Sequence, residues 1–231
     1  MIAGVIRQIT RLFFRDEWEQ VRFYIQSRIE FLQKHPQLAP PLTVQCLLVS
    51  GEDHRHGAHR GFDSRAICRA LVRRLTSNRR EGASTIEQQI VRVITNRFER
   101  TLRRKVHEVF LASLVARHFA KEQLPSVYLL IGYYGWHMND YLQACRQLCL
   151  NPSNLSLEGA SDIVARLMYP QPQFTPLSRS GQIALRKQHL KRLYSRHISD
   201  GTYGYLGVTE RDFSLPHRKI SSEACRTSSY S

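Results

Sequence analysis

The chain has 231 residues, the length of one domain or of one domain with tails. Apolar residues make up 42% of it and aromatic residues 10%, so a buried core can form and wholesale disorder is excluded. Lys and Arg total 34 against 19 for Asp and Glu, which gives a formal net charge of +15. This excess favours an anionic partner, such as nucleic acid, an acidic membrane face or a phosphorylated substrate.

The sequence shows no transmembrane or secretion-signal segment. Its apolar start ends at Arg7, and its longest charge-free stretch, residues 123–139, is interrupted by Pro125 and by two glycines. We therefore expect a chain that is soluble or lies on a surface. The five cysteines are scattered and form no disulfide framework.

The first element expected in the chain is a helix over residues 1–34, where apolar residues recur at three- and four-residue steps. The prolines between Pro36 and Pro41 interrupt this pattern. They predict a boundary between a helical N-terminal arm, residues 1–41, and the main body. The body opens with an apolar run from Leu42 to Ser50, which fits a strand or a helix equally well.

Further helices are expected along the body. Ser84 to Glu87 has the pattern of a capping box, with the serine hydroxyl as the cap, so one helix should begin there. Another should begin near Thr101, with Arg104, Lys105 and Glu108 on the polar face. Its apolar face should hold Leu102, Val106, Val109, Phe110 and Leu114. Helices are also expected over residues 124–134 and 156–168, and strand signals are few, so the predicted fold class is mainly α.

Residues 51–61 form the first cluster with chemical potential, because they hold two acids and three histidines. A polar surface loop is one interpretation. A metal site made by His54, His56 and His59 is a second, although the spacing matches no strong zinc signature. A third makes Glu52 a general base whose surroundings are held by Asp53 and His59.

Two more clusters follow. Residues 82–89 are rich in hydroxyls and amides, which fits a well-capped helix or an anion or sugar site at a helix N-terminus. Residues 103–108 fit a solvated basic face, or a phosphate clamp with Glu108 beside it. Arg104 and Lys105 precede Glu108 by four and three residues and would favour its charged form.

The order and spacing of these clusters resemble glycosyltransferase family 51, the peptidoglycan glycosyltransferases of penicillin-binding proteins and their monofunctional relatives. Residues 51–63 resemble the motif E-D-x-x-F-x-x-H-x-G, with His56 in the Phe position. Residues 82–92 resemble G-x-S-T-I-x-Q-Q-x-x-K, with Arg92 in the Lys position. Residues 104–108 match R-K-x-x-E, and residues 121–135 resemble a fourth motif, with Leu130 where Asn is usual.

This resemblance implies a lysozyme-like helical head with a small jaw that faces the membrane. The glycosyltransferase domain would span residues 42–178, with the jaw at about residues 63–82. A basic C-terminal extension, residues 179–231, would follow it.

The resemblance also implies an activity, the polymerisation of lipid II into β-1,4 glycan strands with inversion and loss of lipid pyrophosphate. Glu52 would be the catalytic base and Glu108 a second catalytic carboxylate, with Asp53 and His59 in supporting positions. Glu108 would also be the residue that meets a divalent metal, Mg²⁺ or Mn²⁺. The expected substrate-binding residues are Ser84, Thr85, Gln88, Gln89, Arg92, Arg100, Arg104 and Lys105.

The implied partners are lipid II, the growing lipid-linked glycan, an anionic membrane surface and other cell-wall synthesis proteins. The implied location is the periplasmic or outer face of a bacterial inner membrane, and a peripheral or cytoplasmic location is the alternative because no transmembrane or signal segment is visible. A degenerate member that binds lipid II or a cell-wall partner without turnover is the alternative, because three motif positions differ and no anchor is visible. Nucleic acid comes third, since only the charge speaks for it.

Overall fold

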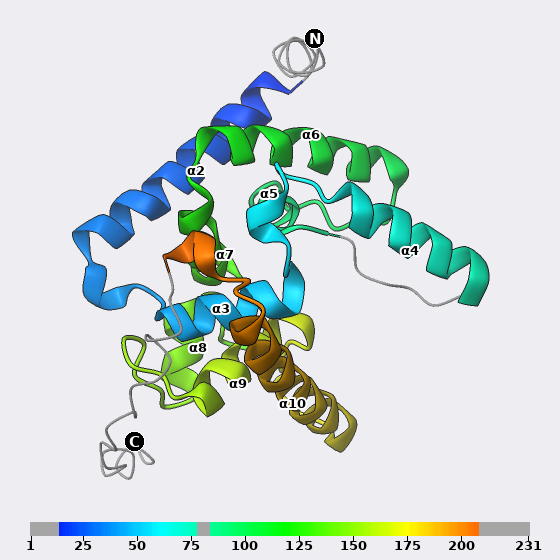
Figure 1. Ribbon diagram of the computed structural model, residues 1–231. Helices are drawn as coiled ribbons and strands as arrows, with labels where there is room; N and C mark the ends of the chain where they lie inside the picture. The colour runs from blue at the N-terminus through cyan, green and yellow to red at the C-terminus, as the bar shows by residue number, and fades with distance from the viewer. Residues whose placement is uncertain (1–13, 78–83, 208–231) are drawn as a thin grey trace.

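The computed structural model describes residues 14–77 and 84–207. Most of this part is helical, with two isolated β-bridges, which confirms the mainly α fold class (Figure 1). The start of the expected arm, the end of the expected jaw and the last part of the C-terminal extension lie outside the described residues. The α-helices are α2 (Arg15–Lys34), α3 (Leu42–Glu52), α4 (Ser64–Ser77), α5 (Ile86–Ile94), α6 (Leu102–His118), α7 (Leu124–Ile131), α8 (Tyr141–Gln147), α9 (Leu157–Met168) and α10 (Leu177–Ser199). Short 3₁₀ turns occur at Pro36–Leu38, His56–Ala58, Lys121–Gln123 and Gly204–Leu206.

The centre of the fold is made by α3, α5 and α7. The apolar run that opens the body is helical, and its second half is buried on all sides because α7, α9 and α10 pack around it. All eight residues of α7 are buried, including Leu130. Helix α2 contributes Val21, Ile25 and Ile29 to the same core, and α10 packs on α9 and α3.

Helix α4 projects from this body, at the right of Figure 1. It begins after Asp63, whose Oδ1 accepts hydrogen bonds from the amides of Arg65 and Ala66, at 3.0 and 3.2 Å. Asp63 also forms an ion pair with Arg55, at 2.9 Å. Asp63 therefore fixes the end of the loop over residues 53–63 to the start of α4. The membrane-facing role of this jaw and the domain boundaries stay predictions.

One local prediction was wrong. Thr85, not Ser84, is the N-cap of α5, since its hydroxyl accepts the amide hydrogen of Gln88. On α6 the polar face, not the apolar one, is the buried face at the N-terminal end. Glu108 is 1% exposed there, whereas Leu102 and Val106 are 81% and 47% exposed. The polar face turns inward because α5 supplies partners for it.

No helix among the described residues is both long and apolar enough to cross a bilayer.

Candidate active site

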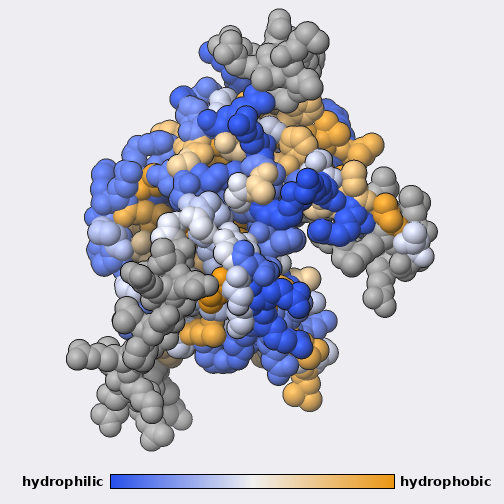
Figure 2. Space-filling view, viewed as in Figure 1, coloured by the Kyte–Doolittle hydropathy of each residue, from blue (hydrophilic) through white to orange (hydrophobic). Residues whose placement is uncertain are grey.

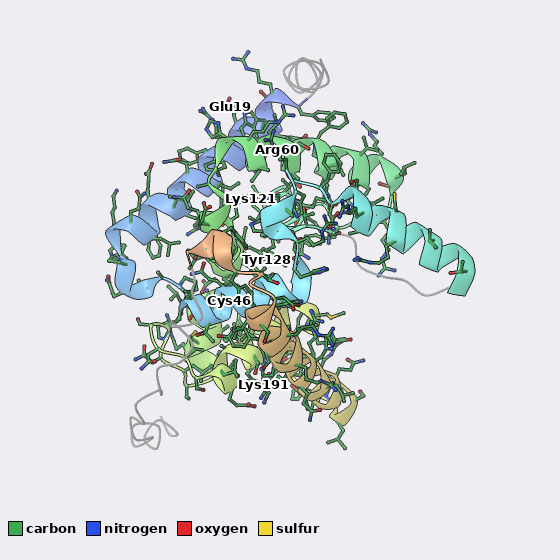
Figure 3. The ribbon with its side chains drawn as sticks, viewed as in Figure 1. Glu19, Cys46, Arg60, Lys121, Tyr128 and Lys191 are labelled. Carbon is green, nitrogen blue, oxygen red and sulfur yellow. The ribbon has the colours of Figure 1, made fainter. Side chains whose placement is uncertain are left out.

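The site is built around the N-terminal half of α5. Glu52, the last residue of α3, meets one end of this helix, and the basic start of α6 meets its side. Tyr128 of α7 lies in the same central region, where α3, α5 and α7 come together (Figure 3). Burial raises the pKa of Tyr128 well above its usual value, and the negative charge of Glu52 adds to this. The tyrosine is therefore a neutral neighbour of the carboxylate.

Both carboxylate oxygens of Glu52 have partners. Gln89 Nε2 donates to Oε2 at 2.9 Å, and Arg186 Nη2 donates to Oε1 at 3.0 Å. The same Arg186 nitrogen donates to the carbonyl of Gly51 at 2.7 Å. The Glu52 side chain keeps 17% exposure and borders a cavity of about 130 Å³ that also touches Ser84. A carboxylate fixed in this way at the wall of a cavity can accept a proton from a bound hydroxyl.

Asp53 and His59 form a buried pair directly after Glu52. His59 Nε2 lies 2.9 Å from Asp53 Oδ2, and the amide of Ile86 donates to the same oxygen at 3.2 Å. Burial alone would raise the pKa of Asp53. Interactions with His56 and His59 outweigh it and hold that pKa well below its usual range. The pair thus joins the end of α3 to the start of α5.

Glu108 lies at the centre of a cation cluster, made of Arg92, Arg104 and Lys105. Arg92 Nε donates to its Oε1 at 2.7 Å, Arg104 Nη1 donates to the same oxygen, and Lys105 Nζ lies 3.6 Å from Oε2. Burial lowers the pKa of Lys105; the charge of Glu108 opposes this shift, and Arg92 and Arg104 add to it. One carboxylate cannot neutralise three cations, so the cation cluster keeps positive charge for an anion.

Hydroxyl and amide groups connect the cation cluster to α5. Ser84 Oγ accepts hydrogen bonds from Arg92 Nη2 at 3.2 Å and from Lys105 Nζ at 3.0 Å. Lys105 also donates to Gln88 Oε1. Thr85 is buried and donates to the carbonyl of Gly61 at 2.8 Å, so it holds the loop before α4.

The structure thus gathers nearly all of the residues expected at the site. The exception is Arg100, which is exposed between α5 and α6 and takes no part in the ion pairs of Glu108. Arg186 was missed, because it is one of several arginines in a basic run and nothing in its spacing sets it apart. Lys121 was missed as well, and it forms an ion pair with the buried Glu87.

The donor set around Glu108 does not fit the expected divalent metal. Both of its oxygens face cationic side chains, and it belongs to no metal-ligating group among residues 14–77 and 84–207. A dication there would be repelled by three positive charges. The metal at Glu108 stays a prediction.

Most of the chain resembles known proteins of one family. A family model described as Transglycosylase matches residues 27–193. Over 95 residues the chain is 37% identical to a monofunctional glycosyltransferase of Staphylococcus epidermidis RP62A. This aligned segment covers 41% of this chain and 35% of that protein. Over 121 residues it is 36% identical to a monofunctional glycosyltransferase of Staphylococcus aureus Newman. This aligned segment covers 52% of this chain and 44% of that protein.

The matched segments thus span less than half the length of these curated relatives. The family match is broader, since it begins within α2, continues into α10 and includes every residue of the site described above. On this match over most of its length, the chain belongs to the transglycosylase family.

Proposed function

We propose that the chain is a peptidoglycan glycosyltransferase that extends a lipid-linked glycan by one lipid II unit at a time. The observation that carries the proposal is that one face of α5 holds two charged centres. Gln89 holds the carboxylate of Glu52, and Arg92, three residues further along α5, pairs with Glu108 in the cation cluster. Transfer of a sugar from a lipid pyrophosphate needs both centres.

Glu52 acts on the acceptor. A sugar hydroxyl is a poor nucleophile, so a positioned base that takes its proton during attack lowers the barrier. Gln89 and Arg186 hold the carboxylate from two sides and limit its rotation. Attack on the anomeric carbon from the face opposite the leaving group inverts that carbon and needs no covalent intermediate.

The cation cluster acts on the leaving group. When the bond from the anomeric carbon to oxygen breaks, the lipid pyrophosphate gains negative charge. Arg92, Arg104 and Lys105 offer hydrogen-bond donors and positive charge for it, and Arg92 can bind two oxygens at once. Glu108 holds the three side chains in one place, so little reorganisation is needed when the charge develops.

A membrane surface is the proposed setting. The exposed apolar side chains of α4 and of the start of α6 support it, and Figure 2 shows hydrophobic surface over the part of α6 nearest α4. Basic residues accompany them on both helices, which suits anionic lipid. These exposed apolar residues are Ile67 and Val72 on α4 and Leu102 and Val106 on α6, together with Phe62 and Phe98 in the segments just before the two helices.

The test is polymerisation of labelled lipid II in detergent, with the glycan products separated on a gel. Glu52→Gln should lower the rate by about 10²- to 10⁴-fold, because the base is lost while the amide keeps the side-chain volume. Glu30→Gln, at an exposed acid of α2, is the matched control and should polymerise like the wild type. Equal rates for the wild type and Glu52→Gln would contradict the role of Glu52.

A binding protein without turnover is the second candidate. It is favoured by the occupancy of Glu52, since neither oxygen is free in this conformation. Tight binding of lipid II by the wild type, with no glycan product under any condition, would select this function over polymerisation.

A further inference from the structure

A third charged centre lies next to Glu52, between the end of α3 and the start of α5. It consists of Asp53, His56, His59 and Glu87, whose ligand atoms all lie within 4.8 Å of one another. Asp53, His56 and Glu87 are at most 7% exposed, and the His59 side chain is 5% exposed. Glu52 and the cation cluster use none of the four for the chemistry described above.

Two polar atoms in this centre have no partner. His56 Nδ1 and Glu87 Oε2 are buried and make no hydrogen bond. They face each other at 3.7 Å, and His56 Nδ1 lies 3.5 Å from Asp53 Oδ2, both too long for a hydrogen bond. Leaving such atoms unpaired inside a protein costs free energy, so the gap between them calls for an occupant.

The remaining contacts orient the four side chains toward that gap. His56 Nε2 donates to the carbonyl of Lys121 at 3.1 Å, which leaves Nδ1 as the ring's lone pair. This is the usual arrangement of a metal-ligating histidine, whose other nitrogen is held by a backbone carbonyl. The second oxygen of Glu87 is held by Lys121, and ligating carboxylates are commonly held in this way.

We propose that Asp53, His56, His59 and Glu87 bind one zinc ion. Ligand atoms at the corners of a tetrahedron around zinc lie about 3.3 Å apart, since each bond is about 2.0–2.1 Å. The gaps from His59 Nε2 to Asp53 Oδ2, from His56 Nδ1 to Asp53 Oδ2 and from His56 Nδ1 to Glu87 Oε2 are 2.9, 3.5 and 3.7 Å. Two imidazoles with two carboxylates suit zinc, whereas Mg²⁺ and Ca²⁺ prefer oxygen ligands alone.

The charge of the centre agrees with a dication. Two buried acids face one lysine, so one negative charge lacks a permanent cation. Lys121 Nζ also lies 3.4 Å from His59 Nδ1. When zinc binds His59 Nε2, the ring proton is on His59 Nδ1. Nδ1 then cannot accept a hydrogen bond from Lys121, which keeps its contact with Glu87.

The proposed site is structural, because four protein ligands leave no position open for substrate. It would join the residue after Glu52 to the residue before Gln88, and thereby fix α3 against the start of α5. The site differs from the one suggested by spacing alone, since His54 is exposed and stacks on His197 instead. It is also distinct from Glu108, which takes no part in it.

The test uses the full chain purified without a histidine tag, stripped by a chelator and titrated with Zn²⁺ against a chromophoric chelator. The wild type should bind one zinc per chain and melt at a higher temperature with zinc than without. Co²⁺ in its place should give the strong visible absorption of a tetrahedral ion. His56→Phe and Glu87→Gln should each weaken zinc binding by at least about 100-fold. His54→Phe, in the same loop, is the matched control and should bind like the wild type.

These readings need no lipid substrate, so they are independent of the proposed function. The proposal is overturned if the wild type holds no stoichiometric zinc, or if folded His56→Phe binds zinc as tightly as the wild type. Loss of zinc from His54→Phe would overturn it too. If His56→Phe does not fold, as judged by circular dichroism, Glu87→Gln decides in the same way, and unchanged binding by it overturns the site.

Discussion

Arg186 is the residue whose role is least visible from the sequence and most direct in the structure. Its Nη2 joins the carboxylate of Glu52 and the carbonyl before it, so it positions the proposed base from a helix about 130 residues further along the chain. Arg186→Met keeps the apolar length of the side chain and removes both hydrogen bonds. We expect the rate of glycan synthesis to fall by about tenfold or more, since bonds to a charged group contribute about 1.5–3 kcal/mol.

Arg186→Lys separates positioning from general packing. A lysine keeps the charge and can reach Glu52 with one hydrogen bond, so it should recover part of the rate that methionine loses. Melting temperatures measured alongside would show whether the two variants are equally stable. Equal loss in both variants at equal stability would mean that the charge beside Glu52 is unimportant.

Other residues of the site could be predicted because their types and spacing are specific. Glu52, Ser84 and Glu108 stand far apart in the sequence, yet the structure brings all three to α5. What the sequence could not supply was which hydroxyl caps that helix. Ser84 and Thr85 satisfy the capping pattern equally. Which of them caps the helix depends on Gly61, whose carbonyl accepts a hydrogen bond from the Thr85 hydroxyl.

At the scale of elements, helix α6 shows why a periodic pattern does not determine its own orientation. Period 3.6 separates an apolar stripe from a polar one, and burial of the apolar stripe is the usual expectation. Here the polar stripe is buried because Arg92 of α5 neutralises Glu108 across the interface. The apolar residues left outside then become candidates for lipid contact, which the sequence pattern alone would have assigned to the core.

Helix α10 is joined to α3 by a buried polar contact. His197 Nδ1 lies 2.9 Å from Ser50 Oγ. Burial lowers the pKa of His197; the nearby His54 lowers it further, Asp200 opposes this and Arg196 adds to it. The unfolded chain therefore binds a proton on this residue at a higher pH than the folded chain does.

Acidification therefore destabilises the folded chain through His197. As the pH falls through about 6.5, the usual pKa of histidine, the unfolded state gains its proton first, so the free energy of unfolding decreases. His197→Gln removes this proton and should flatten the decrease between pH 7.5 and 5.5 in urea titrations. His35→Gln, at an exposed histidine, should keep the wild-type pH dependence. A wild-type slope in His197→Gln would show that another group carries the effect.

At the scale of the whole molecule, the net charge of +15 is arranged in two ways. Part of it is concentrated in the cation cluster, where three cations share Glu108. Other basic residues are paired with acids, as on α10, where Lys187 and Lys191 both form ion pairs with Glu158. The sequence shows the excess but not this division, since pairing depends on which helices pack together.

The core runs continuously from α2 to the turn after α10, which bears on whether the N-terminal arm is a separate unit. Ile25 of α2 and Tyr203 near the end of the described chain belong to one cluster of buried side chains. Ile25→Ala should lower the free energy of unfolding by about 2–5 kcal/mol, because a buried isoleucine is replaced by a cavity. Phe23→Ala on the same helix should change it by less than about 0.5 kcal/mol, since Phe23 is 76% exposed.

The two tryptophans of the chain allow the unity of the fold to be measured directly. Trp18 lies on α2 and Trp136 lies in the loop after α7, so Trp18→Phe and Trp136→Phe each leave one fluorescent reporter. If α2 and the body share one core, both reporters and the far-ultraviolet signal should give the same urea midpoint. Ile25→Ala, added to each reporter variant, should lower both midpoints together. An earlier transition at Trp18 alone would instead mean that α2 unfolds independently, and the boundary at residues 36–41 would then separate two units.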